Sequence, residues 1–177
     1  PESYTLPLHH ALPIEPGAQL APHVTLHWTL DAKTGATTRS TLARLATESP
    51  APADIVIVVL GVNDTTRLTP LHLWRKRQTQ LMDRIRALYA PALIYVTGVP
   101  PLGHFPLLPQ PLRWTLGRHA AALDRTRTAD LAAQPDALPV PFDLPLSPEM
   151  AAEDGVHPSA FLYSLWAKVM AILILHD

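Results

Sequence analysis

The chain has 177 residues, of which 47% are hydrophobic and 16% are charged. This length suits a single domain over residues 1–177, the apolar fraction excludes a disordered chain, and no run of eighteen apolar residues predicts a membrane span. A net charge of −1 excludes a strongly basic nucleic-acid surface, and the absence of cysteine excludes disulfides and thiolate nucleophiles.

Segments typical of strands and helices alternate along the chain. The first strand is expected at Val24–Leu30, where β-branched and aromatic residues are frequent, and a helix is expected over residues 36–48. The later elements, in chain order, are a strand at Asp54–Leu60, a helix over residues 71–89, a strand at Leu93–Val99, a helix over 114–133, a strand at Leu138–Phe142 and a helix over 159–175. This alternation predicts an α/β fold, a three-layer α/β/α sandwich around a doubly wound, flavodoxin-like parallel sheet.

Two of these segments carry specific burial expectations. The branched-aliphatic run Asp54–Leu60 is typical of a strand buried on both faces of a parallel sheet. The helix over 71–89 is expected to bury one apolar stripe. That stripe consists of Leu73, Leu81, Ile85 and Leu88.

Candidate site residues follow the strands, where the carboxyl ends of a parallel sheet place reactive groups. Gly35 lies in a turn before the second element, and its N–H could approach a ligand closely. Asn63 follows Gly61 after the Asp54–Leu60 strand, and its amide could donate to an oxyanion or cap a turn. Asp154 and His157 precede the last helix, where the carboxylate could hold the imidazole toward a nucleophile, or both could be surface residues.

Taken together, the motifs T-G before a helix, G-V-N-D after a strand and D-G-V-H-P before the last helix resemble the SGNH/GDSL hydrolases. The resemblance runs from about Val24 to the C-terminus. It implies the SGNH hydrolase fold and a serine nucleophile. It also implies His157 as base, Asp154 as its orienting acid, and the N–H of Gly35 and the amide of Asn63 in the oxyanion hole.

The family's Gly-Asp-Ser block has no direct counterpart, and the nearest candidate is Ser3, preceded by Pro1 and Glu2. Ser3 lies 32 residues before Gly35, a plausible spacing, so it is the expected nucleophile and its N–H a third oxyanion donor. The central strand that would deliver this serine has no residues before Pro1, so we expect the sequence to begin after that strand. The other serines are weaker candidates. Ser40 lies inside the helix expected after Gly35, and Ser49 and Ser147 are next to prolines in loops. Ser159 and Ser164 follow His157 on the last helix, where they suit capping or surface roles.

These residues predict a serine esterase that cleaves carboxylic esters through an acyl-enzyme, without metal or cofactor. The apolar, proline-rich stretch Pro100–Leu116 either lines an acyl pocket for aryl or lipid-like esters or thioesters, or packs on the sheet edge. Carbohydrate deacetylation, or binding without catalysis on a decayed fold, are the alternatives. A metal-dependent hydrolase is disfavoured by poor ligand spacing. Its candidate histidines are His9, His10, His23 and His27. A small-molecule ester is the expected partner, and the compartment and oligomeric state stay open.

Overall fold

The computed structural model describes residues 27, 29–105, 108–142 and 160–176. The chain divides into two compact units, Pro1–Thr34 with Leu144–Asp177, and Gly35–Asp143. Helix α6 (Ala160–His176) belongs to the first unit and confirms the helix expected over 159–175. No helix in the described part of the chain is long and apolar enough to cross a membrane. That the whole chain is one domain stays a prediction.

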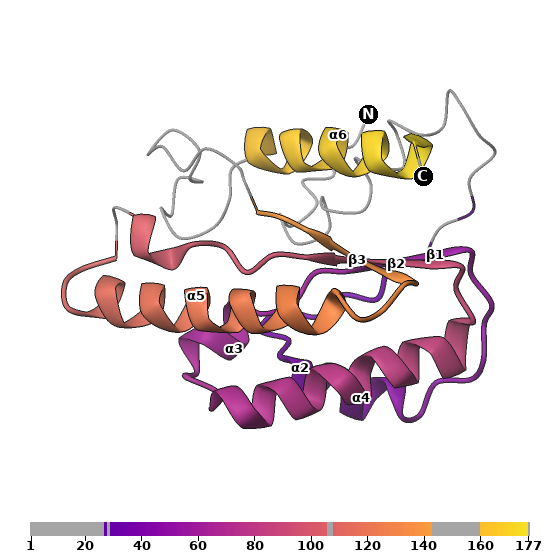
Figure 1. Ribbon diagram of the computed structural model, residues 1–177, viewed down its shortest axis with the longest axis horizontal. Coiled ribbons are helices and arrows are strands. Elements are labelled where there is room, and N and C mark those ends of the chain that lie inside the picture. The colour runs from indigo at the N-terminus through magenta and orange to yellow at the C-terminus, as the bar shows by residue number, and fades with distance from the viewer. Residues whose placement is uncertain (1–26, 28, 106–107, 143–159, 177) are drawn as a thin grey trace, which may run out of the picture. The chain divides into compact units, whose positions relative to one another are not determined.

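The second unit is built on a parallel sheet of three strands in the order β1-β2-β3 (Figure 1). The strands are β1 (Ile55–Val58), β2 (Leu93–Thr97) and β3 (Ala137–Val140). Val56 pairs with Ile94, and Val96 pairs with Pro139. Because the strands are parallel, the segments that follow them emerge at one edge of the sheet. The expected alternation of strands and helices is therefore confirmed over this unit.

Helices of the second unit lie on the same side of the sheet in Figure 1. They are α2 (Thr38–Leu45), α3 (Val62–Thr66), α4 (Leu71–Tyr89) and α5 (Leu112–Leu131), and a 3₁₀ turn, η2 (Leu102–His104), precedes α5. The helices expected over 36–48, 71–89 and 114–133 are confirmed as α2, α4 and α5. Helix α3 was not expected, because its five residues include three β-branched side chains that favour strands.

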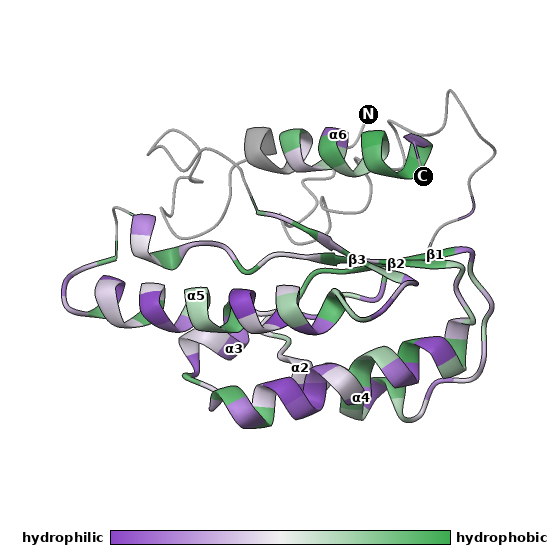
Figure 2. Ribbon diagram, viewed as in Figure 1, coloured by the Kyte–Doolittle hydropathy of each residue, from purple (hydrophilic) through white to green (hydrophobic). Residues whose placement is uncertain are grey.

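The buried stripe of α4 differs from the expected one at two positions, since Met82 is also buried and Trp74 takes the place of Leu73. Leu81, Ile85 and Leu88 are buried as expected, but Leu73 is 38% exposed and Trp74 is buried in its place. The spacing explains the correction, since Trp74 lies seven residues before Leu81 and so faces the same side of the helix. Figure 2 shows the resulting two-sided pattern on α4 and the apolar strands above it.

Expectations for two strands are wrong in part. The Asp54–Leu60 strand is half-buried over most of its length and Val59 is 43% exposed, because β1 has one neighbouring strand among the described residues. The strand expected at Val24–Leu30 lies partly outside the described residues. His27, Thr29 and Leu30 are described, and they are not in a strand.

The segment after β2 is anchored to α5 by two contacts. Gly117 of α5 meets Gly103 so closely that a Cβ on Gly117 would lie 2.5 Å from the Gly103 Cα. Buried Arg127 donates to the Val96 carbonyl at 2.7 Å and to Asp124, whose carboxylate also accepts the Val99 N–H at 3.0 Å. These contacts give the carboxyl edge of β2 a defined shape.

Candidate active site

Two glycines shape the turns at the carboxyl edge of the sheet. Gly35 has φ +72° just before α2, and Gly61 has φ +127° between β1 and α3. Both values lie in the region that L side chains rarely adopt. A Cβ on Gly61 would also lie 2.7 Å from Cγ2 of Val99. The turn after β1 therefore requires glycine, and it starts α3 one residue before Asn63.

Asn63 and the Gly35 turn are in contact, and their role as oxyanion donors stays a prediction. The half-buried Asn63 donates its Nδ2 to the Ala36 carbonyl at 3.0 Å, and Arg67 donates to the Gly35 carbonyl at 3.4 Å. An amide nitrogen carries two hydrogens. The bond to Ala36 uses one of them, which leaves the other for a ligand beside the Gly35 turn.

Asp64 holds the same two segments together, and sequence reasoning missed this role. Its side chain is 0% exposed, and its Oδ2 accepts both the backbone N–H and the hydroxyl of Thr38 at 2.9 Å. The Thr38 hydroxyl in turn accepts from Gln78 of α4 at 2.9 Å. Asp64 is part of the G-V-N-D motif, but its partner Thr38 lies 26 residues away in the sequence, and no local pattern identifies this pairing.

The start of α2 uses a serine that would otherwise be a candidate nucleophile. Thr37 is the N-cap and accepts the Ser40 N–H, while the Ser40 hydroxyl accepts the Thr37 N–H at 2.9 Å. This reciprocal arrangement is a capping box. Ser40 therefore caps the start of α2, a role that the sequence analysis did not assign to it.

Three expected catalytic residues, Ser3, Asp154 and His157, lie outside the described residues, so their roles stay predictions. Within the described ranges, no group of three or more histidine, aspartate or glutamate side chains could hold a metal ion. Of the four histidines proposed for a metal site, the structure describes His27 alone.

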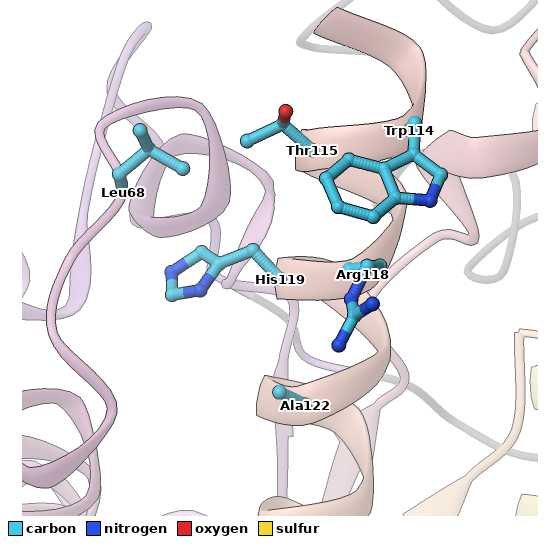
Figure 3. A pocket seen from close by; sticks show the side chains of 6 residues that line it. All are labelled: Leu68, Trp114, Thr115, Arg118, His119 and Ala122. Atoms are coloured by element: carbon cyan, nitrogen blue, oxygen red, sulfur yellow. The ribbon is translucent and has the colours of Figure 1, made fainter. Parts of the chain in front are cut away.

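A hollow of about 310 Å³ lies between α5 and the segment joining α3 to α4. Figure 3 shows Leu68 facing the side chains of α5 across it. Its α5 side is lined by Trp114, Thr115, Arg118, His119 and Ala122. The Arg118 guanidinium lies 5.0 Å from the Trp114 ring centroid, and the buried Nε2 of His119 has no hydrogen-bond partner in the described part of the chain.

The stretch Pro100–Leu116 contains both buried and exposed residues, and its role in binding an acyl group stays a prediction. Leu102 and Leu116 are buried in a core with Trp74 and Val99, and Phe105 packs against it. Trp114 is 58% exposed and, with Thr115, lines the hollow. Leu102, Phe105 and Leu116 therefore pack with the core, whereas Trp114 and Thr115 face the hollow.

Comparisons with known proteins agree with this geometry. A model of the GDSL-like lipase/acylhydrolase family matches residues 15–165, a range that contains Gly35, Asn63, Asp154 and His157 but begins after Ser3. No curated protein matches the chain.

Three solved structures are similar in fold. TesA has a TM-score of 0.68 and 22% identity, over 94% of this chain and 88% of that one. A carbohydrate esterase of family 3 from Talaromyces cellulolyticus has a TM-score of 0.58 and 17% identity, over 88% of this chain and 76% of that one. Axe2, an acetyl xylan esterase from Geobacillus stearothermophilus, has a TM-score of 0.58 and 19% identity, over 90% of this chain and 78% of that one.

The match over most of the chain shows the family, and the structural likenesses show the expected SGNH hydrolase α/β fold. The chemistry of this family is the hydrolysis of ester bonds. With the Gly35 turn and Asn63 meeting at the carboxyl edge of the sheet, the chain belongs to the GDSL-like lipase/acylhydrolase family of SGNH hydrolases.

Proposed function

We propose that this chain is a serine carboxylesterase whose oxyanion hole includes the N–H of Gly35 and the side-chain amide of Asn63. The observation that carries the proposal is the contact between Asn63 Nδ2 and the Ala36 carbonyl, which joins segments 27 residues apart. Donors that are held in place before the reaction stabilise a developing oxyanion without reorganisation. The Gly35 turn and Asn63 lie at the sheet edge where open α/β sheets bind ligands, which supports this assignment.

In the proposed reaction, the Ser3 hydroxyl attacks the ester carbonyl and His157 takes its proton. Asp154 stabilises the imidazolium, and the negative charge on the former carbonyl oxygen is shared by the N–H groups of Ser3 and Gly35 and the Asn63 amide. The alcohol leaves with the proton from His157, and an acyl-serine forms. Water, deprotonated by His157, then releases the carboxylic acid and restores the serine. The scheme requires no metal or cofactor.

The hollow beside α5 supports a substrate with an aryl or lipid-like group. Its lining includes the apolar side chains of Leu68, Trp114 and Ala122, and Trp114 offers an exposed aromatic face. Binding of an apolar or ring-bearing group to such a surface is favourable, because apolar area is removed from water. Leu68 follows Arg67, which contacts the Gly35 carbonyl, so the hollow is next to the oxyanion donors along the chain. Thioesters of similar acyl groups suit the same surface.

The mechanism is tested by treating the full chain with a fluorophosphonate probe and locating the added mass by peptide mapping. We expect labelling at Ser3 that disappears in His157→Ala. Labelling at another serine would replace Ser3 as nucleophile and keep the hydrolase. A folded chain that neither takes the label nor hydrolyses p-nitrophenyl esters would overturn the proposal and favour a binding module on a decayed fold.

The substrate class is tested by a pair of variants in the first turn of α5. Trp114→Ala removes the aromatic lining of the hollow, whereas Leu112→Ala removes an exposed apolar side chain that does not line it. We expect Trp114→Ala to raise the KM of p-nitrophenyl octanoate about tenfold, because apolar contact area is lost, and to change the KM of the acetate little. Leu112→Ala should change neither. Preference for an acetylated sugar, unaffected by Trp114→Ala, would favour carbohydrate deacetylation.

A further inference from the structure

The described part of the chain contains one buried carboxylate beside the proposed oxyanion hole that the catalytic scheme does not use. Asp64 is 0% exposed, and its Oδ2 accepts the N–H and the hydroxyl of Thr38, each at 2.9 Å. A carboxylate removed from water depends on the donors that replace its hydration. No lysine, arginine or histidine among the described residues forms an ion pair with it. The Thr69 hydroxyl also donates to Oδ1 of Asp64, at 3.5 Å. The place of Asp64 is therefore determined by directed hydrogen bonds, of which the two from Thr38 are the shortest.

The network reaches a third helix. Gln78 of α4 donates its Nε2 to the Thr38 hydroxyl at 2.9 Å. A hydroxyl has a single hydrogen, so the hydroxyl that accepts from Gln78 directs its own proton to Asp64. On the other side, Thr69 donates its N–H to the Asp64 carbonyl at 2.9 Å. Asp64 thus links the starts of α2 and α3 to the body of α4.

Both ends of the Asp64–Thr38 contact adjoin an oxyanion donor. Asp64 follows Asn63 in α3, and Thr38 is three residues after Gly35 in the turn that enters α2. Any change in the Asp64–Thr38 distance would therefore move Asn63 relative to Gly35. Oxyanion donors lose much of their effect when they are displaced by about 1 Å.

We propose that Asp64 is a positioning residue, which sets the geometry of the oxyanion hole by holding the Gly35 turn against Asn63 through Thr38. This inference rests on the proposed esterase function. Asp64 does not touch the substrate, so its removal should lower kcat through misplaced donors and leave KM nearly unchanged.

The test uses kcat and KM for a p-nitrophenyl ester, measured on the full chain, with a matched pair of variants at Thr38. Thr38→Val removes the hydroxyl and keeps the N–H, whereas Thr38→Ser keeps both donors. We expect Thr38→Val to lower kcat about tenfold with KM within about twofold, and Thr38→Ser to stay near the wild type. At Asp64, Asp64→Asn keeps an oxygen acceptor for Thr38 and should retain most of the activity that Asp64→Ala loses.

Two controls separate positioning from a general loss of stability. Asp136→Asn removes an ion pair at the opposite end of the sheet and should leave kcat unchanged. The double variant Thr38→Val/Asn63→Ala should have nearly the kcat of Asn63→Ala alone, because Thr38 acts through a donor that is already absent. Circular dichroism verifies folding, and the Thr38 pair decides the question if Asp64→Ala unfolds.

The possible failures are distinguishable. A wild-type chain without esterase activity, or an Asn63→Ala variant with full activity, overturns the proposed function and this inference with it. If Asn63→Ala lowers kcat but folded Thr38→Val keeps it within twofold, the inference alone is overturned. The inference alone is also overturned if the loss of kcat in the double variant equals the product of the losses in Thr38→Val and Asn63→Ala.

Discussion

At the carboxyl end of the sheet, the Gly35 turn and α3 are joined mainly by hydrogen bonds from Thr38 to the buried Asp64 carboxylate and from Asn63 to the Ala36 carbonyl. At the amino end, arginines make the corresponding contacts. Arg86 of α4 donates to Asp136, which precedes β3, at 2.6 Å and to Gln134 at 2.7 Å, and Arg84 donates to the Leu45 carbonyl at the end of α2. The Arg86 and Asp136 side chains are each 32% exposed, whereas Asp64 is 0% exposed.

The difference in exposure between these two sets of contacts predicts different roles, one in the geometry of the site and the other in the stability of the fold. A half-exposed ion pair tolerates small movements, because water competes for both partners and Coulomb attraction varies slowly with distance. Short hydrogen bonds to a buried carboxylate are directional and have no water to replace them. We therefore expect changes at the carboxyl end to alter catalysis, and changes at the amino end to alter stability and its pH dependence.

The largest expected effect is on turnover. Asn63→Ala should lower kcat by about 10²–10³, because one oxyanion donor is removed together with the contact to the Ala36 carbonyl. The thermal midpoint should change far less than kcat does. Gln80→Ala, at an exposed amide of α4, is the matched control for steady-state kinetics. An Asn63→Ala enzyme with wild-type kcat would contradict the expectation that the carboxyl end of the sheet controls catalysis and the amino end controls stability.

A second effect separates the two glycines of the carboxyl end. Gly61→Ala should destabilise the chain by about 3 kcal/mol, since φ is +127° and the new Cβ would lie 2.7 Å from Val99 Cγ2. Gly35→Ala should cost about 1 kcal/mol, since φ is +72° but the nearest atom would be 3.9 Å away. Urea unfolding measures both variants. Equal losses would show that contact with Val99 does not matter.

The third effect belongs to the amino end and depends on pH. The hydrogen bond from Arg86 holds the pKa of Asp136 below its ordinary value. The contribution of Asp136 is therefore complete above its unfolded pKa and is lost as pH falls toward the lower folded value. Asp136→Asn should lower the free energy of unfolding by about 1 kcal/mol at pH 7, a difference that shrinks as pH falls through 4. A difference that stays constant from pH 7 to pH 3 would contradict this role.

The smallest effect is expected on the solvent-facing side of the helices. Arg75 forms a short, two-point ion pair with Asp130, but its side chain is 64% exposed. Arg75→Gln should leave the thermal midpoint within about 1 °C of the wild type, because water and salt compete for the pair. A clearly larger shift, abolished by high salt, would mean that exposed ion pairs matter more here than the amino-end pair does.

Local patterns were sufficient to predict most regular elements of the second unit. The helix expected over residues 71–89 is α4 (Leu71–Tyr89), because helical periodicity over nineteen residues is a strong local signal. The apolar run Asp54–Leu60 contains β1, but its burial was overestimated, since burial depends on which strands pair with it. Leu73 was assigned to the buried stripe in place of Trp74, although the seven-residue spacing from Trp74 to Leu81 places Trp74 on the buried side.

For the candidate site, the sequence alone determined the residue types and their order. Gly35 and Asn63 were identified from their motifs and from the rule that parallel strands end at one edge, and Asn63 donates to the carbonyl of Ala36, the residue after Gly35. Only the tertiary structure decided the role of Asp64, whose donor on Thr38 lies 26 residues away, and the hollow between Leu68 and α5. The physical reason is that periodicity and turn chemistry act over a few residues, whereas a buried hydrogen bond and a cavity wall join segments that meet only after the chain has folded.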